Sequence, residues 1–163
     1  MQLTIMLGSS VSCTDGKGGN ISRLVLNPNT NHLDYLVVHR GLLGGQDHCV
    51  PAGHIEQANA DTVTLTLSTE ELKEMPELEF TVPGQSFRQR SIPDSCAALS
   101  KTTPIKDVDG NLIGHFHGVV MGPEHQIERI LLAEKDDPGI PISQLADCSE
   151  AELTVRPMEQ AIA

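Results

Sequence analysis

The chain has 163 residues and a formal net charge of −11 at pH 7. Nucleic-acid binding needs a basic face that neutralises backbone phosphates, so this charge excludes nucleic acid as an expected partner and favours a basic protein instead. No apolar run approaches the roughly 20 residues that cross a bilayer, and the first residues lack the basic start and apolar stretch of a signal peptide. We therefore expect a cytoplasmic protein with one ordinary domain or two small ones.

The residue types available for a hydrophobic core favour β-structure. The chain has one Tyr, three Phe and no Trp, so Leu, Ile and Val must build the core, and such residues favour short half-buried strands. Its four cysteines show neither CxxC spacing nor a disulfide-dense pattern. In a cytoplasmic chain this predicts reduced thiols.

The first part of the chain has the pattern of a small antiparallel barrel. Asp15 and Gly16 predict a tight turn, and the apolar run from residue 19 to Pro28 is expected to pair with the run LDYLVV that follows. The dipeptide VP at residues 50–51 predicts a strand end, and DTVTLTL alternates as a half-buried strand does. Several short strands with turns at close intervals favour a barrel over an open parallel sheet.

The glycine-rich loop RGLLGGQDH is a candidate interaction surface. Leu42 and Leu43 lie between its glycines, and exposed apolar side chains in such a loop would attract a protein partner. The alternative is that both leucines fold over the end of the barrel. The sequence leaves both interpretations open.

One short helix is predicted at STEELKEM. Ser68 can cap its first turn, Glu71 completes a capping box, and Pro76 lies just beyond its end. Residues 76–103 contain three prolines and resemble no other part of the chain. We expect an inter-domain connection there, part of which, either FTV or SFRQR, adds an extended strand to one barrel.

An internal repeat organises the whole chain. GNISRLVLNP from Gly19 matches GHFHGVVMGP from Gly114, and VPAGHIEQANADTVTL from Val50 matches IPISQLADCSEAELTV from Ile140. An offset of about 90 residues indicates two similar small domains. The expected fold is therefore all-β, with two tandem small barrels and one short helix after the first.

The repeat also predicts the domain boundaries. Residues 1–80 form the first barrel domain with its C-terminal helix, residues 81–103 form the linker, and residues 104–163 form the second barrel domain. Residues 1–80 are expected to fold on their own.

Two histidines are peculiar to the second copy. In a strand, His115 and His117 project to the same face, so they could supply two imidazole ligands to zinc or copper. Asn20 and Ser22 occupy these positions in the first copy, and a polar exposed face explains both copies without a metal. Candidate third ligands are His125 and Glu128. The remaining histidines are expected on the surface: His32, His39, His48 and His54.

Residues 15–67, from DGKGGN through LDYLVV and VPAGHI to DTVTLTL, resemble the photosynthetic reaction-centre barrel (PRC-barrel) family. The short helix and PELEF resemble an extension of bacterial members, and residues 107–156 follow the family pattern more loosely. The resemblance implies β-barrels and non-enzymatic roles. The family includes the cytoplasmic domain of the reaction-centre H subunit and the domain of a ribosome maturation factor that binds a small-subunit ribosomal protein.

The expected function is that of a non-catalytic interaction or assembly module, without a cofactor. No coherent acid–base or nucleophile set is evident, and the unpaired strand edges of small barrels would allow a homodimer. The alternative is a metal- or small-ligand-binding protein, enzymatic or not, that uses the histidines of the second barrel. Fold resemblance alone does not decide between them.

Overall fold

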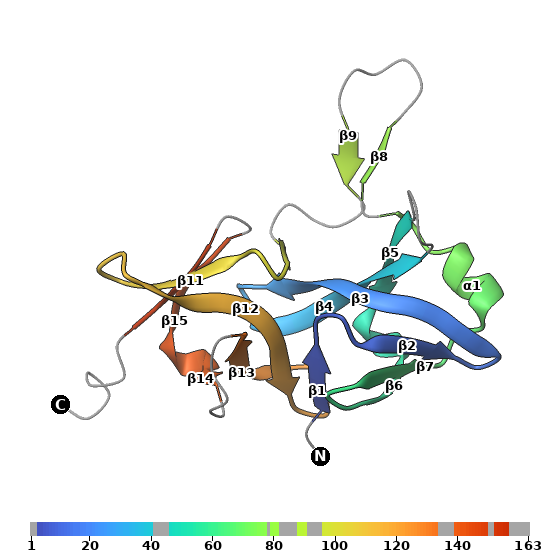
Figure 1. Cartoon of the computed structure of the whole chain (residues 1–163), viewed down its shortest axis with the longest axis horizontal. Helices are drawn as coiled ribbons and strands as arrows, with labels where there is room; N and C mark the ends of the chain where they lie inside the picture. Colours follow the sequence, from blue (N-terminus) through green and yellow to red (C-terminus); the bar gives the residue numbers. More distant parts are fainter. Residues whose placement is uncertain are drawn as a thin grey trace.

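The computed structural model describes residues 3–40, 46–77, 79–81, 88–90, 96–133, 139–149 and 152–156. In this part the chain forms two seven-stranded sheets, a two-stranded sheet and one short α-helix (Figure 1). The predicted β-rich architecture with one helix is confirmed.

The first large sheet has the strand order β5-β4-β3-β2-β7-β6, with β10 also paired to β3. Strands β2 and β7 are parallel, and the other neighbours are antiparallel. The 3-10 helix η1 joins β5 to β6. The elements are β2 (Ser10–Cys13), β3 (Gly16–Asn27), β4 (His32–Arg40), β5 (Gln46–Pro51), η1 (Ala52–His54), β6 (Ile55–Ala58), β7 (Thr62–Leu65) and β10 (Ala97–Leu99).

The second large sheet repeats this order as β14-β13-β12-β11-β16-β15, with β1 paired to β12. Its elements are β1 (Leu3–Met6), β11 (Pro104–Asp107), β12 (Leu112–Met121), β13 (Ile127–Leu132), β14 (Ile140–Pro141), η2 (Ile142–Gln144), β15 (Leu145–Cys148) and β16 (Leu153–Val155). The matching order is what the sequence repeat predicts. Among the described residues, neither strand path closes on itself, so closed barrels are not established.

The predicted hairpin turns are confirmed in both halves. Asp15 lies in the turn between β2 and β3, where Cys13 pairs with Gly16, and Gly110 lies in the equivalent turn between β11 and β12 with φ of 90°. Glycine adopts such positive φ values without the steric penalty of a Cβ. Local turn chemistry therefore determines where each copy begins its longest strand.

The two halves exchange their first strands reciprocally. Strand β1 runs directly into the first half, yet it pairs with β12 of the second, where Ile5 lies opposite Val119. Strand β10 runs directly into the second half, yet it pairs with β3 of the first, where Leu99 lies opposite Leu24. Because Leu24 and Val119 occupy equivalent positions of the repeat, the exchange follows a twofold pseudosymmetry.

Because of this strand exchange, the predicted domain segments do not coincide fully with the two large sheets. Residues 1–80 and 104–163 each supply six strands of one large sheet, and the seventh strand comes from outside that segment. In the described part of the connection, β10 is the strand that joins a large sheet, whereas the strands that overlap the expected segments FTV and SFRQR do not. Strands β8 (Glu79–Thr81) and β9 (Arg88–Arg90) pair only with each other among the described residues. Independent folding of residues 1–80 remains a prediction.

One hydrophobic cluster extends through both large sheets. It contains fully buried side chains from each half, among them Leu24, Leu36, Phe116 and Ile130, together with Ile5 from the exchanged strand β1. Burying an aliphatic or phenyl side chain contributes about 1.5–3 kcal/mol relative to exposure. The halves are therefore joined by shared apolar packing as well as by strand pairing. A smaller cluster, with Tyr35 at its margin, consists of Val25, Val37, Cys49, Cys96 and Ala98.

The helix α1 (Thr69–Lys73) begins as the sequence predicts. The Ser68 hydroxyl accepts the Glu71 amide, and the Glu71 carboxylate accepts the Ser68 amide at 3.0 Å. This reciprocal pair satisfies two amides that the helix itself leaves without partners. Leu72 is fully buried, so α1 packs through this residue onto the first half.

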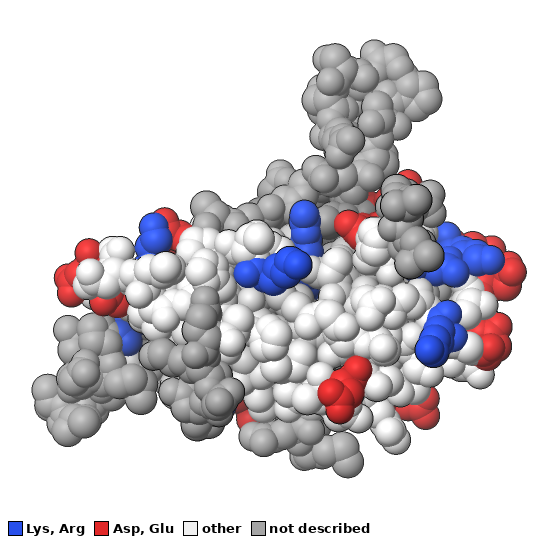
Figure 2. Space-filling view, in the orientation of Figure 1, with Lys and Arg blue, Asp and Glu red and all other residues white. Residues whose placement is uncertain are grey.

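Charged side chains are unevenly distributed on the surface. Figure 2 shows acidic side chains at both ends and along the lower part of the face drawn, and basic side chains at its middle and near both ends. The net charge of the chain is −11. An anion near the basic side chains at the middle therefore meets a more positive electrostatic potential than the net charge implies.

Candidate functional site

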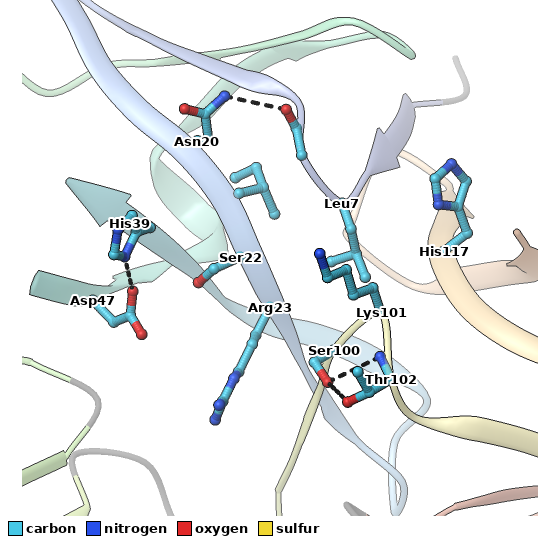
Figure 3. A pocket seen from close by; sticks show the side chains of 12 residues that line it. Leu7, Asn20, Ser22, Arg23, His39, Asp47, Ser100, Lys101, Thr102 and His117 are labelled. Atoms are coloured by element: carbon cyan, nitrogen blue, oxygen red, sulfur yellow. Dashed lines mark hydrogen bonds and ion pairs between the residues drawn. The ribbon is translucent and has the colours of Figure 1, made fainter. Parts of the chain in front are cut away.

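A groove with a volume of about 550 Å³ lies where segments of the two halves meet. Its walls come from β3, β4, β5 and β12 and from the loops that follow the exchanged strands β1 and β10 (Figure 3). We call it the junction groove. It is lined by Leu7, Gly8, residues 20–23, His39, Asp47, residues 100–102 and His117.

Backbone hydrogen bonds to both halves fix the loop that follows β1. The Leu7 amide donates to the His117 carbonyl at 2.8 Å, and the Gly8 amide donates to the Ile21 carbonyl at 2.8 Å. The Asn20 amide group in turn donates to the Gly8 carbonyl at 3.2 Å. The strand exchange therefore forms this wall of the groove.

The loop that follows β10 is fixed by serine and threonine hydroxyls. The Ser100 amide donates to Thr103 Oγ1 at 3.0 Å, and the Thr102 amide donates to Ser100 Oγ at 3.3 Å. Thr103 is buried, and its carbonyl accepts the Phe116 amide at 2.9 Å. These bonds hold the backbone of the exposed Lys101 in a defined turn.

The charges on the groove wall are mainly positive. Arg23 and Lys101 carry full positive charges, and Asp47 is the one carboxylate among the lining residues that the structure describes. Asp47 Oδ1 lies 2.7 Å from His39 Nδ1. The His39 ring therefore already engages this carboxylate, and Arg23 and Lys101 dominate the local potential.

The two histidines of the predicted metal site have different surroundings. Both are half-buried and alternate along β12 with the fully buried Phe116, so they share a face, as the strand pattern predicts. His117 lines the junction groove and His115 does not. Among the described residues, no three His, Cys, Asp or Glu side chains are grouped to hold a metal ion, and His125 and Glu128 supply no third ligand. Metal binding there remains a prediction.

His48 contradicts the expectation of a surface histidine. Its side chain is 3% exposed, and Nδ1 lies 2.9 Å from the Met75 carbonyl. The segment that follows α1 covers it, since the Cys49 amide donates to the Pro76 carbonyl. The local sequence around His48 could not predict this burial, because the covering residues Met75 and Pro76 lie far along the chain, after α1.

Leu42 and Leu43, the predicted interaction surface, lie outside the residues that the structure describes. Their role as a partner contact remains a prediction.

The four cysteines are not joined in disulfides, as the sequence predicts. Burial, with the nearby Asp147 charge, raises the pKa of Cys148 to about 11, and burial also raises the pKa of Cys13. Because the thiolate is the nucleophile, raised pKa values reduce the reactivity of both thiols near neutral pH.

The hairpin between β11 and β12, which we call the second hairpin, exposes apolar side chains. Val108 is 50% exposed and Leu112 is 58% exposed, and they are the exposed large hydrophobic residues of the described chain. The carboxylate of Asp107 accepts the Asp109 amide at 2.9 Å and the Asn111 amide at 3.0 Å. The turn is thus held internally while its apolar side chains face solvent.

No protein-family model matches the chain, and a search of curated proteins finds no match. In the described part of the chain, no helix is long and apolar enough to span a membrane.

Proposed function

We propose that the chain is a non-catalytic cytoplasmic assembly module of two tandem PRC-type barrels, whose second hairpin binds a short amphipathic helix of a partner protein. The observation that carries this proposal is a difference between equivalent hairpins. Helix α1 packs against the hairpin of the first half, where it contacts Asp15 and Gly18, whereas the second hairpin exposes Val108 and Leu112.

The barrel assignment is supported by the connections within each sheet. The end strands β5 and β6 follow one another through η1, and β14 and β15 follow one another through η2. A short covalent link between the two edges of a sheet brings them together, as a small barrel requires. Residues 15–67 resemble the PRC-barrel family in the same order of turns and strands.

Helix α1 shows what kind of element covers such a hairpin. The Thr69 amide donates to Asp15 Oδ1 at 2.9 Å, and the Thr69 hydroxyl donates to Asp15 Oδ2 at 3.2 Å. Leu72 packs so closely over Gly18 that a Cβ there would overlap its side chain. An aspartate of the turn thus binds the helix N-terminus while a helix leucine covers the adjacent strand.

The second hairpin offers the same two features to a partner. Asp109 is equivalent to Asp15 in the repeat and is exposed, and Val108 and Leu112 supply apolar area beside it. A helix of a partner would direct its N-terminal amides to Asp109 and its apolar side chains to Val108 and Leu112. The acidic pair Asp107 and Asp109 favours a partner with basic residues at this contact.

Photocrosslinking in cells of the native host tests this proposal. We would place p-benzoylphenylalanine at Val108 or at Leu112, with Glu56, an exposed residue of β6, as the matched control. We expect adducts with one other protein from both hairpin positions, through a helical segment of that protein, and none from Glu56. No adduct from the hairpin, an equal adduct from Glu56, or an adduct between two copies of this chain would contradict it.

Substitution gives the second test on the partner so identified. Val108→Ser with Leu112→Ser should weaken binding by at least about tenfold, because each buried aliphatic side chain contributes about 1.5–3 kcal/mol. Glu56→Ser should leave binding unchanged. Undiminished binding by the hairpin variant would move the contact elsewhere.

A further inference from the structure

The junction groove has the size and lining of a small-molecule site. Its volume of about 550 Å³ falls within the roughly 300–1,000 Å³ that small-molecule pockets occupy. Leu7 supplies apolar surface, and Ser22 and Asn20 supply polar groups. Ser22 Oγ donates to the Val37 carbonyl at 3.2 Å, so its oxygen is held in place.

Lys101 is the charged group best placed to select a ligand. Its side chain crosses toward the middle of the groove, where its amine faces the region between Leu7 and Ser22 (Figure 3). The hydroxyl-bonded turn of residues 100–103 fixes its backbone, and Lys101 has no ion pair with any described carboxylate. A positioned ammonium group of this kind favours an anion.

Neighbouring charges reinforce this preference. Arg23 lines the groove from β3, and His117 approaches it from β12 of the other half. The only carboxylate among the described lining residues, Asp47, is within 2.7 Å of His39. As far as the described residues show, the groove therefore combines positive charge that has no ion pair with a concave surface, in a protein whose net charge is −11.

We propose that the junction groove binds a compact organic anion bearing a carboxylate or phosphate group, with the Lys101 ammonium as its principal counter-ion. Arg23 adds positive potential, His117 adds a ring nitrogen from the second half, and Leu7 contacts the apolar part of the ligand. Because lining residues come from both halves and both exchanged loops, the ligand stabilises the joined form of the two halves. This proposal does not depend on partner binding at the second hairpin.

The test is an NMR titration of the full chain, labelled with ¹⁵N, at constant ionic strength. Inorganic phosphate and succinate are added separately, which distinguishes a phosphate-selective site from a carboxylate-selective one. We expect saturable shifts for at least one anion at the amides of Gly8, Ser22, Lys101 and His117. Lack of saturation with both anions, or shifts that map outside the groove, would overturn the proposal.

Charge-removing variants complete the test. Lys101→Met keeps most of the aliphatic side chain and should weaken binding by about tenfold, since a charge-assisted contact is lost. The matched control is Lys106→Met, because Lys106 lies outside the groove and pairs with Glu152 at 3.8 Å; its affinity should change by less than about twofold. His117→Gln, which keeps a polar group, should weaken binding less than Lys101→Met does. Wild-type affinity in Lys101→Met would refute the role of Lys101 and with it the proposed site.

Discussion

Asn31 and His125 occupy equivalent turns of the two halves, and each accepts a backbone hydrogen bond from the other half. The Leu33 amide donates to the His125 carbonyl at 3.0 Å, and the Ile127 amide donates to the Asn31 carbonyl at 2.8 Å. Both residues have positive φ, 58° for Asn31 and 68° for His125. The two turns therefore form a reciprocal contact with the same pseudosymmetry as the exchanged strands.

The left-handed backbone at His125 predicts an unusual order of stabilities. His125→Val should destabilise the protein by about 1–2 kcal/mol, because a β-branched side chain is strained at positive φ. The stability of His125→Gly should lie within about 1 kcal/mol of the wild-type value, because glycine removes that strain and the carbonyl that accepts the hydrogen bond belongs to the backbone. Urea denaturation measures both values.

Gln57→Val is the matched control for this pair. Gln57 is exposed on β6, where valine is well tolerated, so its stability should stay near that of the wild type. If His125→Val were as stable as Gln57→Val, the left-handed turn would not contribute to the contact between halves.

The shared core predicts that the two halves unfold together. Phe116 is fully buried in the second half, and Phe→Ala in a core costs about 3–5 kcal/mol. Tyr35 lies on β4 of the first half and is the chain's one tyrosine, with no tryptophan present. Phe116→Ala should therefore shift the urea midpoint of Tyr35 fluorescence as far as the midpoint of the far-UV circular dichroism.

The opposite outcome is equally informative. A Tyr35 midpoint that Phe116→Ala leaves unchanged would show that the first half unfolds independently, as the repeat predicts for residues 1–80. Glu124→Ala, an exposed residue of the second half, should move neither signal and serves as the control.

Local signals in the sequence predict much of the fold. The Asp15–Gly16 turn and the Ser68 capping box depend on residues close together in the chain, where turn and cap chemistry act. The internal repeat predicts that the two large sheets share one strand order. The strand exchange could not be predicted in the same way. Ile5 and Leu99 lie in short apolar strands that would complete either sheet equally well, and strand pairing through backbone groups carries little sequence information.

The sequence predicts the location of the candidate sites less well than it predicts the fold. The alternation along the strand places His115 and His117 on one face. The groove that His117 lines is formed in part by the loop after β1, so the strand pattern alone cannot tell which histidine reaches it. Lys101 lies in a segment interpreted as a linker; the Ser and Thr residues around it indicate a turn, although not the wall that this turn faces. The exposure of Val108 and Leu112 depends on the tertiary structure, which packs α1 against the first hairpin and leaves these two side chains in solvent.

The close approach of β1 to β12 predicts that Gly118 cannot carry a side chain. A Cβ there would overlap the Ile5 carbonyl and crowd Met6, and both obstacles are backbone atoms that cannot rotate away. Gly118→Ala should therefore destabilise the protein by roughly 1–3 kcal/mol, through displacement of the exchanged strand. Gly53→Ala is the control, because a Cβ on Gly53 would meet no atom within 4 Å.

Hydrogen exchange locates the effect of Gly118→Ala. The amides of β1 should lose protection more than those of β5, an edge strand of the first sheet that pairs with β4. Equal thermal stability of the Gly118 and Gly53 variants would contradict the observed pairing of β1 with β12.

The contact between Asp15 and α1 predicts a specific dependence of stability on pH. The Thr69 amide, which donates to the Asp15 carboxylate, is the main cause that lowers the pKa of Asp15; the Thr69 hydroxyl and Lys73 act in the same direction. A lowered folded-state pKa means that the ionised form stabilises the fold. This contribution is complete above the unfolded-state pKa of about 3.9 and is lost as the pH falls through the folded-state pKa.

Asp15→Asn should thus be less stable than the wild type near neutral pH, and the stabilities of the two proteins should converge in acid. Urea denaturation at about pH 7 and at about pH 2 measures this convergence, with Asp61→Asn, an exposed carboxylate at a different turn, as the control. A stability difference between Asp15→Asn and wild type that stays constant over this range would show that the Asp15 charge does not anchor α1.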